Sequence, residues 1–522
     1  MHGTGSTISL WMKTAQLPHS PGLAMDSEAD VCIVGAGIAG LTTAYLLCKE
    51  GKSVIVLDDG PGIADGETAR TTAHLSNAID DWYFEMERLH GREGSRLAAQ
   101  SHTAAIERIE YIVAQEHIDC DFEHVDGYLF LAPGHKSSML DDEHAAAHTA
   151  GLRDVEKLLR APLESFDTGP CLRFPRQGQF HPLKYMAGLA AAITRMGGRI
   201  FGNAHVHKFK SGDPAEVTIE DGTRVLARNV VVATNSPIND LAKIHTKQAP
   251  YRTYVIAAPV PAGSVARALY WDTNDPYHYV RLQSVPAGPE AAEKTDMLIV
   301  GGEDHKTGQA DDGLDRFSRL EAWARERFPM MGQVAARWSG QVMETIDGLA
   351  YIGRNPGDEP NVYIATGDSG MGMTHGTIAG ILLCDLIVGR TSPWQELYDP
   401  ARKRVSAGGT FLKENLNVAA QYAQWISPAE VDSIEQIPLG SGAVMRQGLK
   451  KLAVHRDENG HTYIHSAVCT HLGCIVSWNS TEKTWDCPCH GSRFDAYGEV
   501  INGPAFSSLQ EVEEEKEAPL RR

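Results

Sequence analysis

Two cysteine–histidine pairs near the C-terminus carry the strongest chemical signal in the sequence. Cys469 and His471 belong to the stretch "CTHLGC", and Cys487 and His490 belong to "CPCHGS". Two thiolates and two imidazoles on two short loops predict a metal site. Such a set suits a tetrahedral zinc ion. It also suits an iron–sulfur cluster in which the thiolates bind one iron and the imidazoles bind the other.

The distribution of the ligands distinguishes these alternatives. Zinc fingers pair ligands of one kind, whereas each loop here offers one cysteine and one histidine. Over residues 431–510 the sequence resembles the Rieske [2Fe-2S] proteins of the cytochrome-complex type. The resemblance implies that Cys469 and Cys487 ligate one iron and that His471 and His490 ligate the other.

The same resemblance implies a disulfide between Cys474 and Cys489, with free thiols as the alternative. Neutral imidazoles make such a cluster less negative, so its potential is on the order of −150 to +300 mV, against about −400 mV for all-cysteine ferredoxins. Ser492 matches a serine that hydrogen-bonds a bridging sulfur in the high-potential members, but Phe494 stands where those members carry tyrosine. We therefore expect a potential below the top of the range.

A second site is expected near the N-terminus, where Gly35, Gly37 and Gly40 have the spacing G-x-G-x-x-G. The glycines follow an apolar strand at 31–34 and open a helix that runs to about residue 48. A second strand at 53–57 then ends at Asp58. In this setting the glycines let the backbone approach a pyrophosphate at the helix N-terminus, and Asp58 can accept a hydrogen bond from a ribose hydroxyl.

Three stretches extend this signal: "VGAGIAGLTTAYLL", "GETARTTAHLS" and "DGLAYIGRNPGDEPNVYIATGDSGMGMTHG". On them, residues 28–395 resemble the FAD-dependent oxidoreductases of the D-amino-acid oxidase-like superfamily. The resemblance implies FAD as cofactor, with the backbone amides of Gly370, Met371, Gly372 and Met373 at the pyrimidine end of the flavin. A second glycine-rich βαβ unit for NADH is not found, because "LIVGGEDHKTG" is followed by no apolar helix.

The loop that contains Thr71, Thr72 and His74 is also expected to touch the flavin. In the sarcosine and dimethylglycine dehydrogenase branch of the superfamily, a histidine just after a small-residue pair is joined covalently to the cofactor. His74 has a similar place, but Ala73 precedes it where that branch carries tryptophan. A noncovalent pocket histidine is the alternative.

The candidate catalytic residues are His278, Arg281 and His375. Alternation along "DPYHYVRLQ" puts His278 on the face opposite Tyr277 and Tyr279, and one of these faces could line a pocket. Arg281 or Arg252 could hold a substrate carboxylate bidentately, although each could equally be a surface arginine. His375 lies in the predicted flavin loop.

The amino-acid composition limits the kinds of partner that the protein is expected to bind. The formal net charge of −19 disfavours a nucleic-acid or anionic-membrane partner, since both need clustered positive charge. The first thirty residues lack a basic region followed by an apolar one, so no secretory signal is expected. The most apolar run, 377–389, is too short to span a bilayer, so no transmembrane segment is expected either. Scattered cysteines suit a cytoplasmic protein.

These signals predict an α/β (α+β) fold. A Rossmann-type FAD-binding domain spans residues 28–400, with a mixed-sheet substrate domain inserted at about 245–345. A helical connector follows at 401–430, then a small all-β Rieske domain at 431–510 and an acidic tail at 511–522.

FAD accepts two electrons at once, whereas a [2Fe-2S] cluster carries one at a time. A protein that holds both is therefore predicted to link hydride transfer to single-electron transfer. We expect a flavin-dependent dehydrogenase that oxidises a C–N bond of an amine or amino acid. Its electrons would pass from FAD through the cluster to an external one-electron acceptor. The alternatives are an electron-transfer flavoprotein that serves a partner oxygenase or quinone, and an oxidase that uses O2 and keeps the cluster for stability or sensing.

Overall fold

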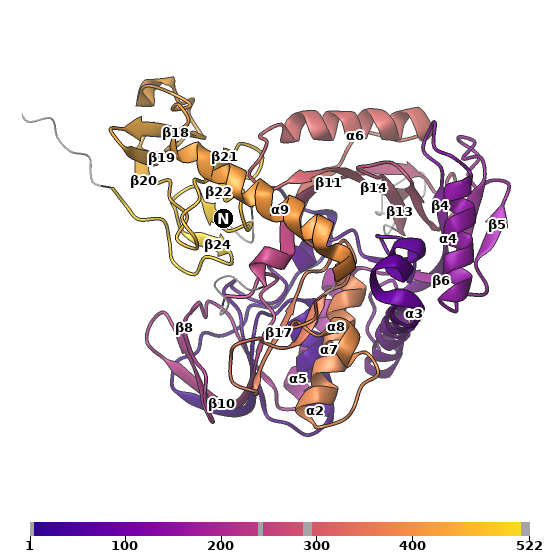
Figure 1. The fold of residues 1–522 in the computed structure, drawn as a ribbon, viewed down its shortest axis with the longest axis horizontal. Helices are drawn as coiled ribbons and strands as arrows, with labels where there is room; N and C mark the ends of the chain where they lie inside the picture. Colours follow the sequence, from indigo (N-terminus) through magenta and orange to yellow (C-terminus); the bar gives the residue numbers. More distant parts are fainter. Residues whose placement is uncertain (1–4, 239–243, 285–294, 404, 513–522) are drawn as a thin grey trace, which may run out of the picture.

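Three parts of the protein can be followed in Figure 1. The computed structural model describes residues 5–238, 244–284, 295–403 and 405–512, so the expected acidic tail lies almost entirely outside the described residues. A parallel-sheet domain forms the lower part of the figure. A second sheet domain lies at the upper right, and a small β domain formed by the C-terminal residues lies at the upper left.

The first sheet has eight strands and carries the glycine-rich turn. Its main path runs in the order β16 (Tyr351–Arg354), β17 (Val362–Thr366), β10 (Arg224–Val232), β1 (Ser27–Val34), β2 (Val54–Leu57) and β7 (Arg199–Phe201). The path from β17 to β7 is parallel, and β16 pairs antiparallel with β17. Strands β8 (Val206–Lys210) and β9 (Ala215–Ile219) extend it beside β10. Strand β1 ends in four buried residues because both faces of this parallel sheet are covered.

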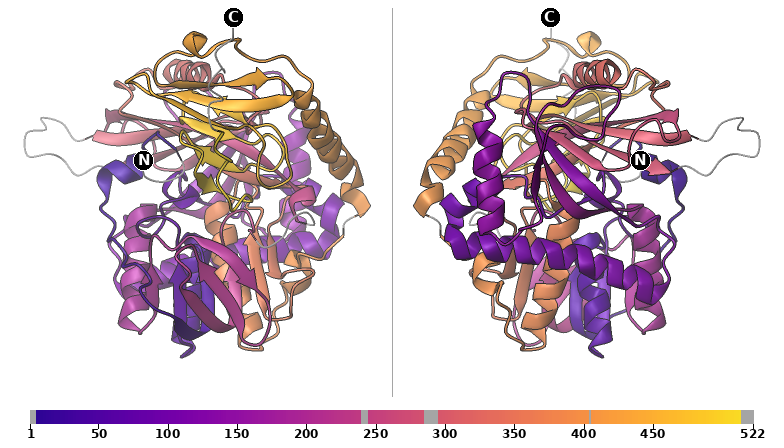
Figure 2. Two further views of the ribbon diagram at one scale, coloured as in Figure 1. Left: turned by 90° about the vertical axis from the view of Figure 1, so that its left-hand side faces the viewer. Right: turned by 90° about the vertical axis from the view of Figure 1, so that its right-hand side faces the viewer.

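Helices α2 (Ile38–Lys49), α5 (Pro182–Arg195) and α7 (Gly372–Ile387) pack together beside this sheet. Small residues let α7 approach α2 closely. A Cβ atom added at Gly380 would lie 2.4 Å from Cγ2 of Thr42. The long helix α3 (Tyr83–Glu116) crosses in front of them in the right-hand view of Figure 2, with a kink at Gly91. These elements confirm the predicted fold class.

The second sheet has nine strands and draws on more of the chain than the sequence predicts. Its main path is β15 (Ala336–Thr345), β11 (Gln248–Pro261), β14 (Thr295–Lys306), β13 (Tyr279–Ser284), β12 (Leu269–Asp272), β4 (Glu123–Phe130), β6 (Cys171–Gln179) and β3 (His74–Leu75), with β5 (Glu156–Leu158) beside β6. Only the strands from β11 to β15 come from residues 245–345. Strand β12 pairs in parallel with the distant β4, a register that no local pattern encodes.

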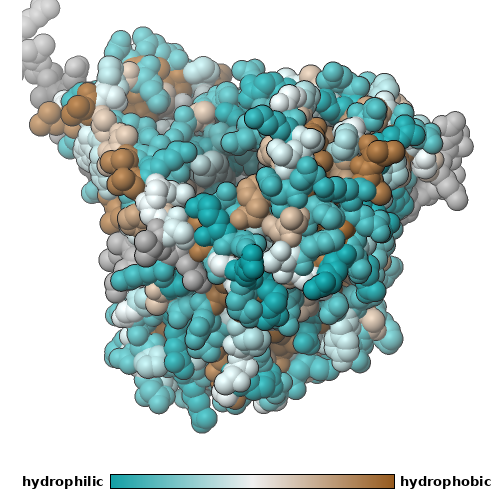
Figure 3. Space-filling view, turned by 45° about the vertical axis from the view of Figure 1, so that its right-hand side comes forward, coloured by the Kyte–Doolittle hydropathy of each residue, from teal (hydrophilic) through white to brown (hydrophobic). Residues whose placement is uncertain are grey.

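Helix α6 (Gly313–Arg327) covers one face of this sheet and buries Phe317, Leu320 and Ala324 there. The shorter helices are α1 (Leu10–Thr14), α4 (Ser138–Thr149) and α8 (Gln395–Tyr398). The face drawn in Figure 3 is mostly hydrophilic, with hydrophobic residues in small groups. Among the described residues, each helix is too short or too polar to cross a membrane.

The C-terminal domain is a small all-β unit, as predicted. One sheet contains β18 (Ser441–Gln447), β19 (Lys450–Arg456) and β20 (Thr462–Ser466), and the other contains β21 (Ser477–Asn479), β22 (Thr484–Asp486), β23 (Arg493–Asp495) and β24 (Val500–Asn502). Trp478, Trp485 and Phe494 belong to its core. The left-hand view of Figure 2 shows this domain in front of the nine-stranded sheet.

Helix α9 (Gly408–Gln421) connects the two halves and runs between them in Figure 1. The sequence predicts this helix from an apolar stripe, but the stripe is not buried: Leu412 and Leu416 remain 59% and 60% exposed. Polar contacts attach the helix instead. Lys306 pairs with Glu414, and Gln309 donates to the side-chain oxygen of Asn417 at 2.7 Å.

Candidate active site and metal centre

A cavity of about 750 Å³ joins the glycine-rich turn to the second sheet. Gly35 and Asp58 line one part of it, and the loop around Gly370 lines another. The C-terminal domain also contributes to the wall. Residues 500–503, 505 and 506 lie beside the cavity near Asn203 and His205. Both stretches that the sequence predicts to hold a dinucleotide therefore line this cavity.

The glycine-rich turn has the close contacts that exclude larger residues. Gly35 has a φ of +104°, which favours glycine, and its N–H donates to the carbonyl of Leu57 at 2.8 Å. A Cβ atom at Gly40 would lie only 1.9 Å from the carbonyl oxygen of Gly35. Helix α2 begins directly after Gly37. The N–H of Ile38 donates to the hydroxyl of Thr68 at 3.1 Å, and the following N–H groups of the first turn can receive the phosphates of a dinucleotide.

Asp58 lies at the end of β2 and helps to hold the turn. Its two oxygens accept hydrogen bonds from the backbone N–H groups of Ala36, at 2.6 Å, and Gly60, at 3.0 Å. Burial outweighs these bonds and raises the pKa of Asp58 to about 7. The predicted contact of this carboxyl with a ribose remains a prediction.

The loop from Gly370 to Met373 lies at the start of helix α7 and lines the cavity. Gly370 has a φ of +70°, and a Cβ atom there would lie 2.2 Å from Oδ2 of Asp80. Met371 caps α7 without a side-chain hydrogen bond. The first N–H groups of the helix can therefore stabilise negative charge in the cavity.

The metal centre lies in the C-terminal domain, where the structure brings the four predicted ligands together. The thiols of Cys469 and Cys487 are buried, and the ring centroids of His471 and His490 lie 5.0 Å apart. Nδ1 of His490 is buried and has no hydrogen-bond partner. A metal ion would satisfy this nitrogen, so the residues fit the cluster.

A disulfide joins Cys474 to Cys489 and so links the two ligand loops. The sulfurs of this pair and of Cys487 all lie within 4.8 Å of one another. Because the disulfide occupies two of the three sulfurs, only Cys487 of this trio can bind metal. Hydrogen bonding to Cys487 lowers the pKa of the Cys469 thiol, and the backbone of His471 lowers it further.

Comparison with known proteins identifies both halves of the chain. The model of the FAD dependent oxidoreductase family matches residues 30–386, and the model of the Rieske [2Fe-2S] domain matches residues 427–513. The protein belongs to the FAD dependent oxidoreductase family. It carries a C-terminal Rieske domain, and its cofactors are FAD and a [2Fe-2S] cluster.

One of the relatives matches almost the whole chain, and two other proteins match a smaller part of it. The Bacillus subtilis protein YhfW, described as a Rieske 2Fe-2S iron-sulfur protein, is 32% identical over 96% of this chain and 97% of its own length. Gamma-glutamylputrescine oxidoreductase of Escherichia coli is 27% identical over 69% of this chain and 84% of its own length. Glycine oxidase from Geobacillus kaustophilus shares the fold, with a TM-score of 0.58 at 18% identity over 72% of this chain and 99% of its own.

The loop that carries His74 lines the cavity of the oxidoreductase together with Thr71 and Thr72. Nδ1 of His74 is 3.0 Å from Oγ1 of Thr72, and Nε2 is buried without a hydrogen-bond partner. Burial lowers the pKa of His74 to about 3, so the ring is neutral. Helix α1 supports this loop, since Trp11 donates to the carbonyl of Thr71 at 2.6 Å. A covalent bond from His74 to flavin remains a prediction.

The structure corrects the role expected of His278. Alternation along β13 puts the two tyrosines, Tyr277 and Tyr279, in the cavity wall and leaves His278 outside the lining. His278 stacks on Trp323 of α6 at 4.3 Å, and its Nδ1 lies 3.0 Å from Oδ2 of Asp272. His278 therefore lies outside the described cavity wall.

The two arginines predicted for carboxylate binding also lie outside the described cavity wall. Arg281 is buried, and its N–H groups donate to the carbonyl oxygens of Ala73 and Phe180 at 2.9 and 3.0 Å. It therefore positions the His74 loop rather than a substrate. Arg252 is fully buried and faces the Rieske domain.

His375 does line the cavity. Its Nδ1 donates to the carbonyl oxygen of Asp368 at 2.8 Å, which fixes the start of the flavin loop. Burial lowers the pKa of His375 to about 4, so this ring is neutral as well.

A buried ionic group attaches the Rieske domain to the rest of the oxidoreductase. The side chain of Glu482 is 0% exposed and lies 3.5 Å from Arg70 and 3.7 Å from Arg252, two arginines of the FAD-binding half. The backbone N–H of Thr7 donates to it at 3.0 Å. Burial alone would raise the pKa of Glu482, but the arginines lower it to about 2.

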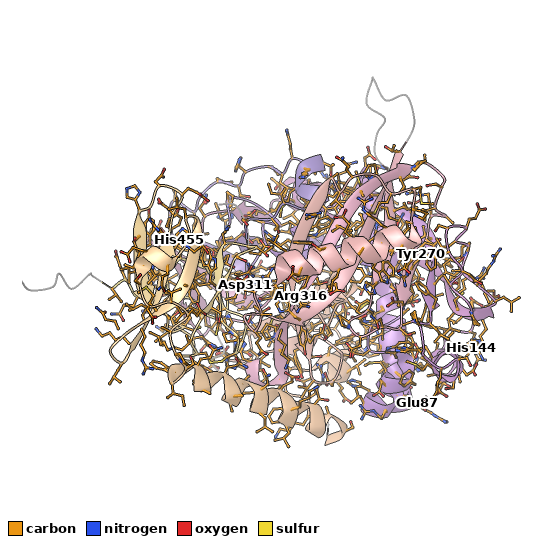
Figure 4. The ribbon with its side chains drawn as sticks, turned by 90° about the horizontal axis from the view of Figure 1, so that it is seen from above. Glu87, His144, Tyr270, Asp311, Arg316 and His455 are labelled. Carbon is orange, nitrogen blue, oxygen red and sulfur yellow. A yellow bond between two sulfur atoms is a disulfide. The ribbon has the colours of Figure 1, made fainter. Side chains whose placement is uncertain are left out.

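A second contact lies nearer the surface. The hydroxyl and backbone N–H of Ser480 donate to Asp311 at 2.7 and 2.8 Å. In Figure 4 the label His455 marks the Rieske domain. Asp311 lies at the end of α6 that is nearer to this domain. The Rieske domain is thus fixed at both a buried and an exposed point.

One histidine of the FAD-binding half meets the metal centre. The ring of His245 lies 5.0 Å from that of His471 and 6.1 Å from that of His490, measured between centroids. Three residues later, Oε1 of Gln248 accepts a hydrogen bond from Thr366 at 3.2 Å, and Thr366 lines the cavity. A short covalent and hydrogen-bonded route therefore leads from the cavity to His245, and a ring contact leads from His245 to the cluster ligands.

Besides Asp58, the cavity wall contains seven carboxylates that the sequence did not predict, and four of these lie outside residues 58–68. The four come from separate segments of the chain: Asp80, Asp304, Glu344 and Asp368. No spacing in the sequence links them, because the folding of the two sheets alone brings them together.

Proposed function

We propose that this protein oxidises a C–N bond of a small amine and passes the electrons through its Rieske domain to an external acceptor. When bound, FAD would supply a hydride acceptor for the carbon beside nitrogen, and the cluster would supply a one-electron carrier. The similarity to gamma-glutamylputrescine oxidoreductase of Escherichia coli supports an amine as substrate. The buried free cysteines, among them Cys32 and Cys48, support a reducing compartment such as the cytoplasm.

The residues around the cavity have defined parts in this proposal. Backbone N–H groups at the start of α7 would stabilise the negative charge that oxidation of the substrate leaves at the flavin. Tyr277 and Tyr279 form an aromatic wall that excludes water from the reacting carbon. His375 holds the flavin loop through the carbonyl of Asp368.

The observation that carries the proposal is the orientation of the metal centre. His471 and His490 face His245 of the FAD-binding half, and His490 is buried. The buried Glu482 group fixes the domain in this position. A cluster kept only for stability would not need its histidines to face the flavin half.

The test is anaerobic mixing of the FAD- and cluster-loaded protein with candidate amines. We expect loss of flavin absorbance followed by the electron paramagnetic resonance (EPR) signal of a reduced cluster. In a Cys487→Ser variant, which lacks a cluster ligand, we expect flavin reduction without that signal and loss of turnover with an external one-electron acceptor.

Two other outcomes would contradict the proposal. Flavin that stays oxidised with every amine would favour an electron-transfer protein reduced by a partner. A wild-type cluster that stays oxidised, with unchanged O2 turnover in Cys487→Ser, would favour an oxidase.

A further inference from the structure

The substrate side of the cavity is strongly acidic. Asp80 precedes α3, Asp304 lies on β14, Glu344 lies on β15, and Asp368 follows β17, and all four line the cavity. Burial raises the pKa of Glu344, and the charges of Asp81 and Asp80 raise it further. The carboxylates are therefore close enough to raise one another's pKa, and a bound ammonium group would favour their charged form.

No ion pair among the described residues holds these carboxylates in their charged form, and burial raises the pKa of Asp80 to about 8. Among the described residues, none of these four carboxylates lies within 4.0 Å of a lysine, arginine or histidine nitrogen. Oδ1 of Asp304 is buried and has no hydrogen-bond partner. A buried carboxylate oxygen without a partner is costly, and a ligand with N–H donors would remove that cost.

The cavity also lacks a cation that could receive a substrate carboxylate. The cationic or basic side chains in its described wall are Arg70, His74, His205 and His375. Arg70 is committed to Glu482 and to the carbonyl oxygen of Ser339. His74 and His375 are neutral, as shown above, and His205 pairs with Asp59 at 3.0 Å.

Aromatic rings add a second, independent feature that suits a cation. Tyr277, Tyr279 and Trp271 line the same region, and the two tyrosine rings lie 5.3 Å apart. The hydroxyl groups are held in place, because Tyr277 donates to Asp80 at 3.0 Å and Tyr279 lies 2.7 Å from the hydroxyl of Thr253. Aromatic faces beside carboxylates attract ammonium groups.

We propose that the substrate is a diamine or polyamine, with at least one ammonium group besides the nitrogen that is oxidised, and not an α-amino acid. The second ammonium binds among Asp304, Glu344 and Asp80 and orients the reacting carbon toward the flavin. A substrate carboxylate would be repelled by the same groups. This inference rests on the proposed function for the reaction itself, but it concerns binding, which can be measured without turnover.

Three probes of one chain length test it on the FAD- and cluster-loaded protein: 1,4-diaminobutane, 1-aminobutane and 4-aminobutanoate. Binding to the oxidised protein is followed anaerobically by the flavin difference spectrum and by the unfolding temperature. We expect the diamine to bind at least about tenfold more tightly than the monoamine, since it adds a charge-assisted hydrogen bond. The amino acid is expected to bind more weakly than either.

The variants Glu344→Gln and Asp304→Asn should raise the KM for the diamine at least about tenfold while changing the KM for the monoamine little. Glu326→Gln, on the exposed end of α6, is the matched control and should leave both unchanged. The inference is wrong if 4-aminobutanoate binds as tightly as the diamine, if the diamine does not bind, or if both cavity variants bind it normally.

This result is separable from the proposed function. Tight diamine binding with a cluster that stays oxidised would refute the electron route and keep the substrate class. Reduction of flavin and cluster by an amino acid, with no preference for the diamine, would do the reverse.

Discussion

Replacement of Glu482 by glutamine tests how the Rieske domain is held against the flavin half. The substitution keeps the shape of the side chain and removes its charge, which leaves Arg70 buried without this counterion and leaves Arg252 with Asp486 alone, at 3.9 Å. A carboxyl group whose pKa falls from 4.5 to about 2 contributes about 3 kcal/mol of stability at neutral pH. Loss of one partner from a buried ionic group costs about 3–5 kcal/mol, so the two estimates agree.

The pH dependence of this contribution has a definite sign. Because the folded pKa of Glu482 is lowered, its stabilisation is present above the unfolded pKa of about 4.5 and is lost as the pH falls toward about 2. The wild type should therefore lose stability over this range, and Glu482→Gln should lack this part of the acid dependence.

The assay is thermal unfolding at pH 7, followed by cluster absorbance and by flavin fluorescence. We expect the cluster transition of Glu482→Gln to fall by about 5 °C or more, and protease cleavage between residues 401 and 430 to become faster. Glu458→Gln is the matched control, because Glu458 is an exposed glutamate of the same domain. An unchanged transition in Glu482→Gln would refute the claim that this group anchors the domain.

Three further changes test separate parts of the structure. Gly40→Ala places a Cβ atom 1.9 Å from the carbonyl of Gly35. The variant should therefore lose FAD on gel filtration but keep the EPR signal of its cluster. Retained FAD would contradict the assignment of the turn. Cys474→Ser removes a disulfide with a sequence separation of 15 and should destabilise the Rieske domain by about 3 kcal/mol in denaturant titration, whereas no change would show that Cys489 needs no partner. His245→Leu should slow the transfer of electrons from flavin to cluster in stopped-flow absorbance without slowing flavin reduction by substrate, and an unchanged transfer rate would exclude the His245 route.

The two cofactor sites could be predicted from the sequence because each depends on local spacing. The glycines at 35, 37 and 40 fix one turn between adjacent elements, and the ligands at 469–490 lie on two neighbouring loops. Geometry of this kind is set by residues that are close together in the sequence, so it can be predicted from their spacing.

The residues that face the substrate depend on long-range register and could not be predicted in this way. Alternation along β13 separated His278 from Tyr279, but only the packing of α6 over one face decided that the tyrosines line the cavity. Glu344 and Asp304 meet across strands that are paired through β11. In the sequence, Arg252 is a possible ligand for a substrate carboxylate. Only the structure shows that it contacts Glu482 of a distant domain instead.

The central claim is that electrons leave the flavin through the Rieske cluster. The most direct measurement is a single anaerobic turnover with 1,4-diaminobutane, in which flavin absorbance and the EPR signal of the reduced cluster are recorded on the same freeze-quenched samples. The account predicts that flavin is reduced first and that the cluster signal then rises at least as fast as steady-state turnover. A fully reduced flavin beside a cluster that remains oxidised would contradict it.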